Sequence, residues 1–201
     1  MDIVRSLSDL ISVMPAIVRD SGLFRVDASA DDGQYAVNWG TFNAAGTQDR
    51  AGKQSNGDTH DSIFRFSNCT IPAKAKIVSA SIELCQVQTV SGKDINLTIV
   101  GNDADNAVAP TNASEYQNLV LTAATVAWEL EAITATGFLK SPDITSIIQE
   151  IVDRAGWASG NAVQILVKNN NSGPGGYLLS YTYNQGASYG AKLNVEYDYV
   201  P

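Results

Sequence analysis

The sequence predicts a mainly β protein: an antiparallel, jelly-roll-like β-sandwich with one packed helix and a short N-terminal helix. Eight or more short segments have the pattern of strands, and Gly-rich turns separate them. One amphipathic helix stands out among them and runs directly into an apolar strand over residues 162–167. Of the 201 residues, 44% are hydrophobic and 17% are charged, so we expect a folded domain with a sizeable core.

The N-terminal residues look like an addition to this sandwich. Within Asp2–Arg19, apolar residues recur at alternating spacings of four and three, as in a helix that packs on a partner: Ile3, Leu7, Leu10, Met14 and Ile17. Pro15 should kink that helix or stand in the first turn of a second one. The helix could lie on its own domain or serve in docking or oligomerisation. We divide the chain into a helical segment, 1–22, and a β-sandwich domain, 23–201.

The strand pattern follows this segment. Residues 29–59 are rich in Gly, Asn, Asp and Ala, which predicts a first strand and then a long exposed loop. Further short strands are expected over Ser62–Phe66, Asp94–Gly101, Leu119–Leu121, Ala127–Leu130, Ile133–Thr136, Tyr177–Asn184 and Ala191–Tyr199. Residues 110–118 form a polar excursion between two of them.

The clearest strand is Lys76–Val90, where apolar and polar residues alternate. Side chains on a strand point alternately to its two faces, so one set should be buried: Val78, Ala80, Ile82 and Leu84. The other set should face away from the core: Ser79, Ser81 and Glu83.

The helix is predicted from four isoleucines that share one face at helical spacing: Ile144, Ile147, Ile148 and Ile151. Ser141 or Asp143 can cap its start, and Pro142 suits its first turn. Gly156 should end the helix, and Trp157 should plug that end against the sandwich. The isoleucine face is expected to pack on the edge of the sandwich.

Charge and composition exclude several classes of protein. A net charge of −8 and a pI of about 4.5 argue against nucleic-acid binding, which needs clustered Lys and Arg. No run approaches the roughly twenty apolar residues of a membrane-spanning helix. Asp2 precedes Arg5 and polar residues interrupt the first apolar stretch, so we expect no signal peptide. Two cysteines, Cys69 and Cys85, are too few for a disulfide scaffold and are expected to be free thiols.

Few residues suggest catalysis or metal binding. His60, which a His-based triad would require, lies in a polar sequence, and we expect it in a surface loop. Asp103 and Asp105 lie in a run of carboxylates and amides that could hold Ca²⁺, although the EF-hand pattern fails. A turn with internal hydrogen bonds is the alternative for these residues. We predict no cofactor and no catalytic residue, assign no metal site, and leave calcium at this turn open.

Two acidic and several aromatic residues allow a sugar-related interpretation. Glu129 and Glu131 should share one strand face, a placement compatible with a carboxyl pair of a glycosidase or with an exposed acidic face. Tyrosines should pair on two strands, Tyr181 with Tyr183 and Tyr197 with Tyr199. Such pairs ordinarily stabilise a sheet, and they could also stack on sugars or line a protein interface.

Four segments together resemble the DNRLRE-type β-sandwich modules of bacterial extracellular proteins and tailed-phage virion proteins: FRFSNCTIPAKAKIVSASIEL (64–84), NLTIVGNDADNAV (96–108), PDITSIIQEIVDRAGWASGNAVQILV (142–167) and AKLNVEYDY (191–199). The resemblance covers roughly Phe24 to Tyr199. It implies a jelly-roll-like sandwich that binds or builds rather than catalyses. Many such modules resemble carbohydrate-binding domains attached to enzymes or adhesins.

A module of this type without a secretion signal, linker or catalytic neighbour resembles a phage structural protein more than part of a secreted hydrolase. We therefore expect a non-enzymatic component of a tailed-phage virion: a head decoration, head fibre or tail protein made in the host cytoplasm. Its partners would be other virion proteins and its own copies, with no nucleic acid or membrane. The residues expected to bind these partners are Ile3, Leu7, Leu10, Met14 and Ile17. A carbohydrate-binding module acting as an adhesin is the alternative.

Overall fold

The computed structural model describes residues 15–201. Its strands are β1 (Val18–Arg25), β2 (Asp32–Ala36), β3 (Thr41–Asn43), β4 (Gln48–Lys53), β5 (Thr59–Phe66), β6 (Lys76–Gln86), β7 (Val90–Asn102), β8 (Leu121–Ile133), β9 (Gly137–Lys140), β10 (Val163–Asn169), β11 (Tyr177–Tyr181) and β12 (Lys192–Tyr199). The α-helices in this range are α2 (Ala113–Gln117) and α3 (Thr145–Val152). Two 3₁₀ turns, η1 (Tyr183–Gln185) and η2 (Ala187–Tyr189), precede the last strand.

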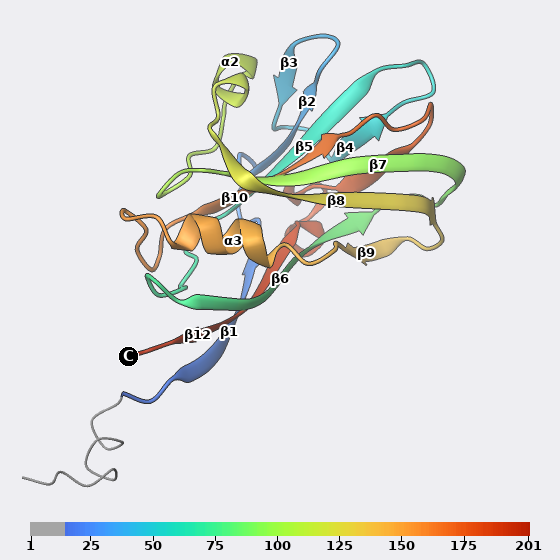
Figure 1. Ribbon diagram of the computed structural model, residues 1–201. Helices are drawn as coiled ribbons and strands as arrows, with labels where there is room; N and C mark the ends of the chain where they lie inside the picture. Colours follow the sequence, from blue (N-terminus) through green and yellow to red (C-terminus); the bar gives the residue numbers. More distant parts are fainter. Residues whose placement is uncertain (1–14) are drawn as a thin grey trace, which may run out of the picture.

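The strands form one antiparallel sheet in the order β1-β12-β6-β11-β4-β5-β10-β7-β8. Strand β2 is added on β5 and carries β3, while β9 is added on β6. The sheet curls, so that β6 and β12 face β7 and β10 across a shared core (Figure 1). This arrangement confirms the predicted mainly β, jelly-roll-like sandwich.

The core receives alternate side chains from both halves of the curled sheet. From β7 and β10 these are Ile95, Leu97, Ile99, Val163, Ile165 and Val167. From β12 they are Leu193, Val195 and Tyr197. Burial of these aliphatic side chains is the main favourable contribution to folding, and it fixes the register of the paired strands.

Strand β6 follows most of the predicted alternation. The three core residues in its middle are buried: Ala80, Ile82 and Leu84. Val78 is only half-buried, and Ile77 occupies the core instead. The ladder to β12 pairs Ser79 with Glu196 and then Ile77 with Tyr197, which leaves Val78 in a β-bulge. The extra residue reverses the alternation from that point.

Helix α3 packs with all four predicted isoleucines fully buried: Ile144, Ile147, Ile148 and Ile151. It lies between β8 and β6 (Figure 1). The prediction of its start was inaccurate, because Pro142 precedes the helix and Ser141 accepts a hydrogen bond from the Ile82 amide instead (3.1 Å). The Asp143 carboxylate, one residue before the N-cap, accepts the amide hydrogen of Thr145 at 2.9 Å.

Several elements differ from their prediction. The expected exposed loop within 29–59 contains β2, β3 and β4, and the polar excursion 110–118 contains α2. Three predicted short strands between 119 and 136 are replaced by the single strand β8, and β9 was not predicted. Strand β11 ends at Tyr181, so Tyr183 does not share a strand face with it.

The chain joins the sandwich earlier than expected. Val18 and Arg19, assigned to the N-terminal helix, lie in β1, which pairs with β12 along its whole length. The boundary proposed at residue 22 therefore falls inside a strand of the sheet. The helix predicted before Pro15 lies outside the described residues.

Candidate functional site

A hollow lies on the outer face of strands β1, β12 and β6, and we call it the outer-face groove. The register places two rows of side chains across these strands. One row is Leu23, Asn194 and Ser81, and the other is Ser21, Glu196 and Ser79. Directly opposed residues in an antiparallel sheet point to the same face. Because the neighbouring positions on β12 fill the core, these rows point away from it.

The groove has a volume of about 550 Å³, and most of the residues that line it are polar or charged. The Asn194 side-chain nitrogen is buried and has no hydrogen-bond partner among residues 15–201. At one border, the Lys192 ammonium lies 3.4 Å from Glu83 Oε2 and 3.3 Å from the centre of the Phe138 ring. No aromatic side chain of the described chain lines the groove itself. The groove can thus offer hydrogen bonds to hydroxyl, amide or main-chain groups.

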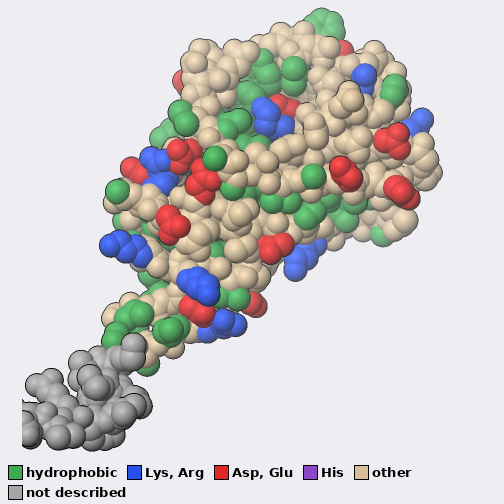
Figure 2. Space-filling view, viewed as in Figure 1, with side chains coloured by type: hydrophobic (Ala, Val, Ile, Leu, Met, Phe, Trp, Pro, Cys, Tyr) green, Lys and Arg blue, Asp and Glu red, His purple; other side chains and the backbone are tan. Residues whose placement is uncertain are grey.

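A second hollow, the end hollow, lies where β1 begins and β12 ends. It has a volume of about 510 Å³ and is lined by Ile17, Ala73, Lys74, Lys76, Asp198, Tyr199 and Val200. Ile17 is 71% exposed and Val200 is 53% exposed. Figure 2 shows apolar side chains gathered at this end of the molecule, with charged side chains around them. Arg19 and Asp198 form an ion pair of 2.8 Å beside it.

Of the five residues predicted to bind a partner, Ile17 lies in the end hollow. The other four lie outside the described residues: Ile3, Leu7, Leu10 and Met14. The partner role of all five stays a prediction.

The acidic turn after β7 is neutralised from within the chain. Arg154 donates a hydrogen bond to Asp105 at 2.7 Å and forms an ion pair with Asp103. The Asp105 carboxylate packs directly against Gly156, at a place where a Cβ atom would force the carboxylate to shift. The side chain of Asn161 donates to the main chain of the same turn at 3.0 Å. These contacts support the alternative of a hydrogen-bonded turn, and residues 15–201 hold no group of three or more His, Cys, Asp or Glu that could bind a metal.

The histidine prediction was wrong. His60 lies in β5 rather than in a loop and is only 7% exposed. Its Nε2 atom lies 3.0 Å from the Gln54 side-chain nitrogen, and burial lowers its pKa. Glu129 and Glu131 are exposed and occupy alternate positions of β8, so they share one face as predicted.

Aromatic side chains mainly pack within the chain. The Tyr197 and Tyr199 rings lie 6.0 Å apart, and the Tyr181 ring packs on Tyr189 rather than on the predicted Tyr183. Trp157 is buried and donates a hydrogen bond to the Ile71 carbonyl at 3.1 Å, as expected of a plug at the helix end. Both cysteines are buried free thiols, as predicted.

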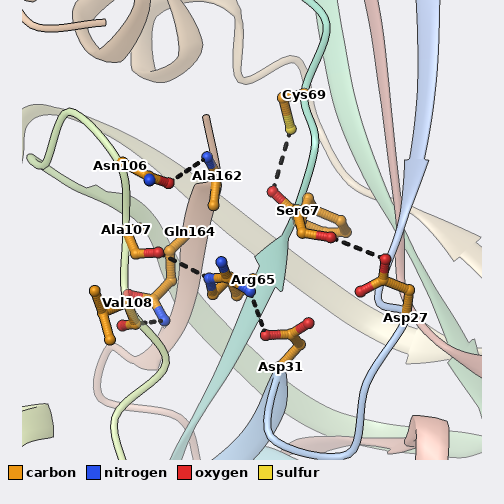
Figure 3. A network of polar contacts seen from close by, with 11 residues as sticks. Asp27, Asp31, Arg65, Ser67, Cys69, Asn106, Ala107, Val108, Ala162 and Gln164 are labelled. Atoms are coloured by element: carbon orange, nitrogen blue, oxygen red, sulfur yellow. Dashed lines mark hydrogen bonds and ion pairs between the residues drawn. The ribbon is translucent and has the colours of Figure 1, made fainter. Parts of the chain in front are cut away.

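A polar network that the sequence did not reveal centres on Arg65 of β5 (Figure 3). Its guanidinium lies 2.7 Å from the Asp31 carboxylate and donates to the Ala107 carbonyl at 2.8 Å. Burial raises the pKa of Asp31, and the contact with Arg65 opposes that rise. Ser67 donates to Asp27 at 2.8 Å in the same region. The network connects the segment after β7 to β5 and gives the buried Asp31 carboxylate a positively charged partner.

No protein-family model matches this sequence, and no curated protein matches it significantly. Within residues 15–201, no helix combines the length and apolar character needed to cross a bilayer.

Proposed function

We propose that the protein is a non-enzymatic structural component of a tailed-phage virion, acting through contacts with its own copies and with other virion proteins. The resemblance of four segments to DNRLRE-type modules suggests this class. The observation that carries the proposal is the end hollow, where Ile17 and Val200 expose apolar surface next to a strand at the sheet edge. A head decoration, a head fibre and a tail protein are all compatible with this role.

The edge strand β1 supports contact with a partner at this end. β12 is its one strand partner among the described residues, so its other edge offers main-chain donors and acceptors. Most of its residues are exposed, and it follows directly on Ile17. The residues before this point carry the apolar pattern that predicts a helix, and we propose that they cover the end hollow of a neighbouring copy or another virion protein. Each buried apolar side chain would contribute about 1.5–3 kcal/mol before the cost of ordering.

Deletion of residues 1–16 tests the proposal and leaves β1 intact. We expect a nearly unchanged melting temperature, because the core of the sandwich lies within the remaining residues. We expect loss of oligomers in light scattering and loss of incorporation into purified particles of the phage that encodes the chain. A large fall in melting temperature with assembly intact would show that these residues belong to the domain's own core.

Two point variants refine this test. Ile17→Asp places a charge in the end hollow and should weaken assembly while the melting temperature is unchanged. Val108→Asp is the matched control, because Val108 is 77% exposed and lies outside that hollow. Equal loss of assembly in both variants would contradict a specific role for the end hollow.

A carbohydrate-binding adhesin is the second candidate, favoured by the polar rows of the outer-face groove. Asn194 and Ser81 could hydrogen-bond sugar hydroxyls, although no aromatic side chain of residues 15–201 lines the groove for stacking. A glycan array with the full chain tests this function. Binding that Asn194→Ala abolishes without a change in melting temperature would support the adhesin over the virion role.

A further inference from the structure

A row of polar side chains crosses the interior of the sandwich. Asp49 of β4 lies opposite Ser180 of β11, which lies opposite Gln86 of β6. Opposed residues point to the same face. That face is the core, because Ala51 and Leu84, two positions along from Asp49 and Gln86, are buried in it. The three polar residues are only 1–2% exposed.

Two of the three side chains in this row have no hydrogen-bond partner within residues 15–201. Both carboxylate oxygens of Asp49 and both amide atoms of Gln86 are buried without a hydrogen bond to any described residue. Buried polar groups are nearly always paired, because an unpaired one has lost its contacts with water and gained nothing in return. For an ionised carboxylate the cost is larger still. Asp49 and Gln86, which flank Ser180 on the same face, thus leave four buried atoms without a partner in the described chain, and we take these atoms as an indication of a ligand.

A second carboxylate faces the same interior. Asp32 of β2 is 1% exposed; its Oδ2 accepts the amide hydrogen of Tyr183 at 2.7 Å, and its Oδ1 has no partner. The amide of the preceding residue, Thr182, donates to the Thr47 carbonyl at 3.2 Å, just before β4 begins. This contact ties the chain beside Asp32 to the start of β4. Burial raises the pKa of Asp49, and the charge of Asp32 adds to that rise.

Among the described residues, Asp31, which precedes Asp32 in the sequence, has a positively charged partner, and Asp32 and Asp49 do not. Asp31 has the guanidinium of Arg65 at 2.7 Å. No ion pair of the described residues includes Asp32 or Asp49. Arg50 follows Asp49 in β4, so its side chain points to the opposite face of the sheet. The positive charge that would balance this pair is therefore not supplied by the surrounding side chains.

We propose that Asp49, Asp32 and Gln86 form a Ca²⁺ site inside the sandwich. Both oxygens of Asp49, Oδ1 of Asp32 and Oε1 of Gln86 are hard oxygen ligands, the kind that calcium takes in sets of six to eight. The Ser180 hydroxyl lies between two of these side chains and can complete the set together with main-chain oxygens or water. One divalent ion would balance both carboxylates and join β2, β4 and β6. The site differs from the acidic turn at Asp103 and Asp105, where Arg154 already neutralises the two carboxylates.

The test uses the full chain at pH 7.5, first stripped with EGTA and then given 1 mM Ca²⁺ or 1 mM Mg²⁺. We expect the melting temperature to rise by at least about 5 °C with Ca²⁺ and by much less with Mg²⁺. We also expect one calcium per chain by elemental analysis after dialysis. If the protein retains no calcium and melts at the same temperature in EGTA and in Ca²⁺, the proposal is wrong. Asp32 and Asp49 would then be a pair of protonated carboxyl groups. An equal rise with Mg²⁺ would overturn the assignment to calcium.

Variants locate the ion. Asp49→Asn should lose the calcium-dependent rise, and in EGTA it should melt no lower than the wild type because the Asp49 carboxyl group has no hydrogen bond to lose within residues 15–201. Gln86→Leu keeps both carboxylates and should weaken calcium binding at least about tenfold. Glu131→Gln, which removes a charge from exposed β8, should keep the full response. A full calcium response in both Asp49→Asn and Gln86→Leu would place the ion elsewhere and overturn the site.

Discussion

A Cβ atom placed on Gly101 would stand 2.9 Å from the Cγ2 atom of Ile147. Helix α3 therefore packs directly on the backbone of β7, with no room for a side chain between them. Ile151 and Thr122 approach the same position to 2.9 and 3.0 Å. The isoleucine face of the helix and the glycine of the strand thus form one close contact between elements far apart in the sequence.

Gly101→Ala should destabilise the protein by about 1–3 kcal/mol, because the added methyl group displaces the helix or forces its isoleucines out of their rotamers. Urea unfolding should show a lower midpoint with an unchanged slope. Gly173→Ala is the matched control: its nearest neighbour would be 3.8 Å away, so stability should change by less than about 0.5 kcal/mol. Equal stability of the two variants would contradict the close packing of α3.

The packed face of α3 was predictable because helical spacing is a local property of the sequence. The bulge at Val78 was not, because it is defined by how β6 pairs with β12. The start of helix α2 has a local signal in the sequence: Asn112 accepts the Glu115 amide hydrogen at 3.0 Å, and Glu115 accepts the Thr111 amide hydrogen at 2.7 Å. This is close to a capping box, which an N-x-x-E sequence can reveal.

The interior carboxylates show the limit of reading the sequence alone. Asp49 lies in a Gly-, Asn- and Asp-rich stretch, the composition typical of an exposed loop. Its burial follows from the pairing of β4 with β11, which is distant in the sequence. Arg154, which balances Asp103 and Asp105, follows them by 51 and 49 residues. Composition suggested calcium at that exposed turn, whereas tertiary structure places unbalanced carboxylates at Asp32 and Asp49.

Glu150→Ala should weaken the junction of α3 and β8. The Glu150 carboxylate accepts the amide hydrogens of Ala123 at 2.7 Å and Ala124 at 2.8 Å. These residues lie where the β7–β8 ladder is irregular, so the carboxylate supplies acceptors that the sheet lacks there. We expect a loss of about 1–2 kcal/mol in chemical denaturation and faster hydrogen exchange of both amides.

Glu131→Ala serves as the control for that variant. Glu131 is exposed on the same strand, and the structure gives its side chain no hydrogen bond or ion pair within residues 15–201. Its stability and the exchange of the Ala123 and Ala124 amides should match the wild type. If hydrogen exchange of the Ala123 and Ala124 amides is unchanged in Glu150→Ala, then water protects these amides as well as the carboxylate does, and the prediction is wrong.

Both thiols should resist modification in the folded protein. Cys69 is fully buried, its thiol donates to the Phe66 carbonyl at 3.2 Å, and burial raises its pKa to about 12. Cys85 is 6% exposed, and burial raises its pKa as well. A thiol reagent such as DTNB should label neither residue in buffer and both in guanidinium. Labelling of fewer than two thiols after unfolding would indicate a disulfide, and rapid labelling in buffer would contradict the burial.

When divalent ions are removed with EGTA, the free energy of unfolding should depend on pH because of Asp32. Burial raises the pKa of Asp32 to about 7, although the hydrogen bond from the Tyr183 amide opposes the rise. The folded state then holds a proton that the unfolded state releases near pH 4. The stability gained from this group is present below pH 4 and is lost as the pH rises to about 7, with a slope of up to about 1.4 kcal/mol per pH unit.

Neighbouring groups make a variant comparison necessary. Asp49 and Asp31 have raised pKa values and change stability in the same direction, while Arg50 keeps its charge across this range. His60 acts in the opposite direction, because its lowered pKa makes the folded state more stable as the pH rises through about 6.5. Asp32→Asn keeps the acceptor for the Tyr183 amide and removes the titration. The wild type should therefore lose stability relative to Asp32→Asn between pH 4 and 7 in EGTA; parallel curves for the two proteins would show that Asp32 is ionised in the fold throughout.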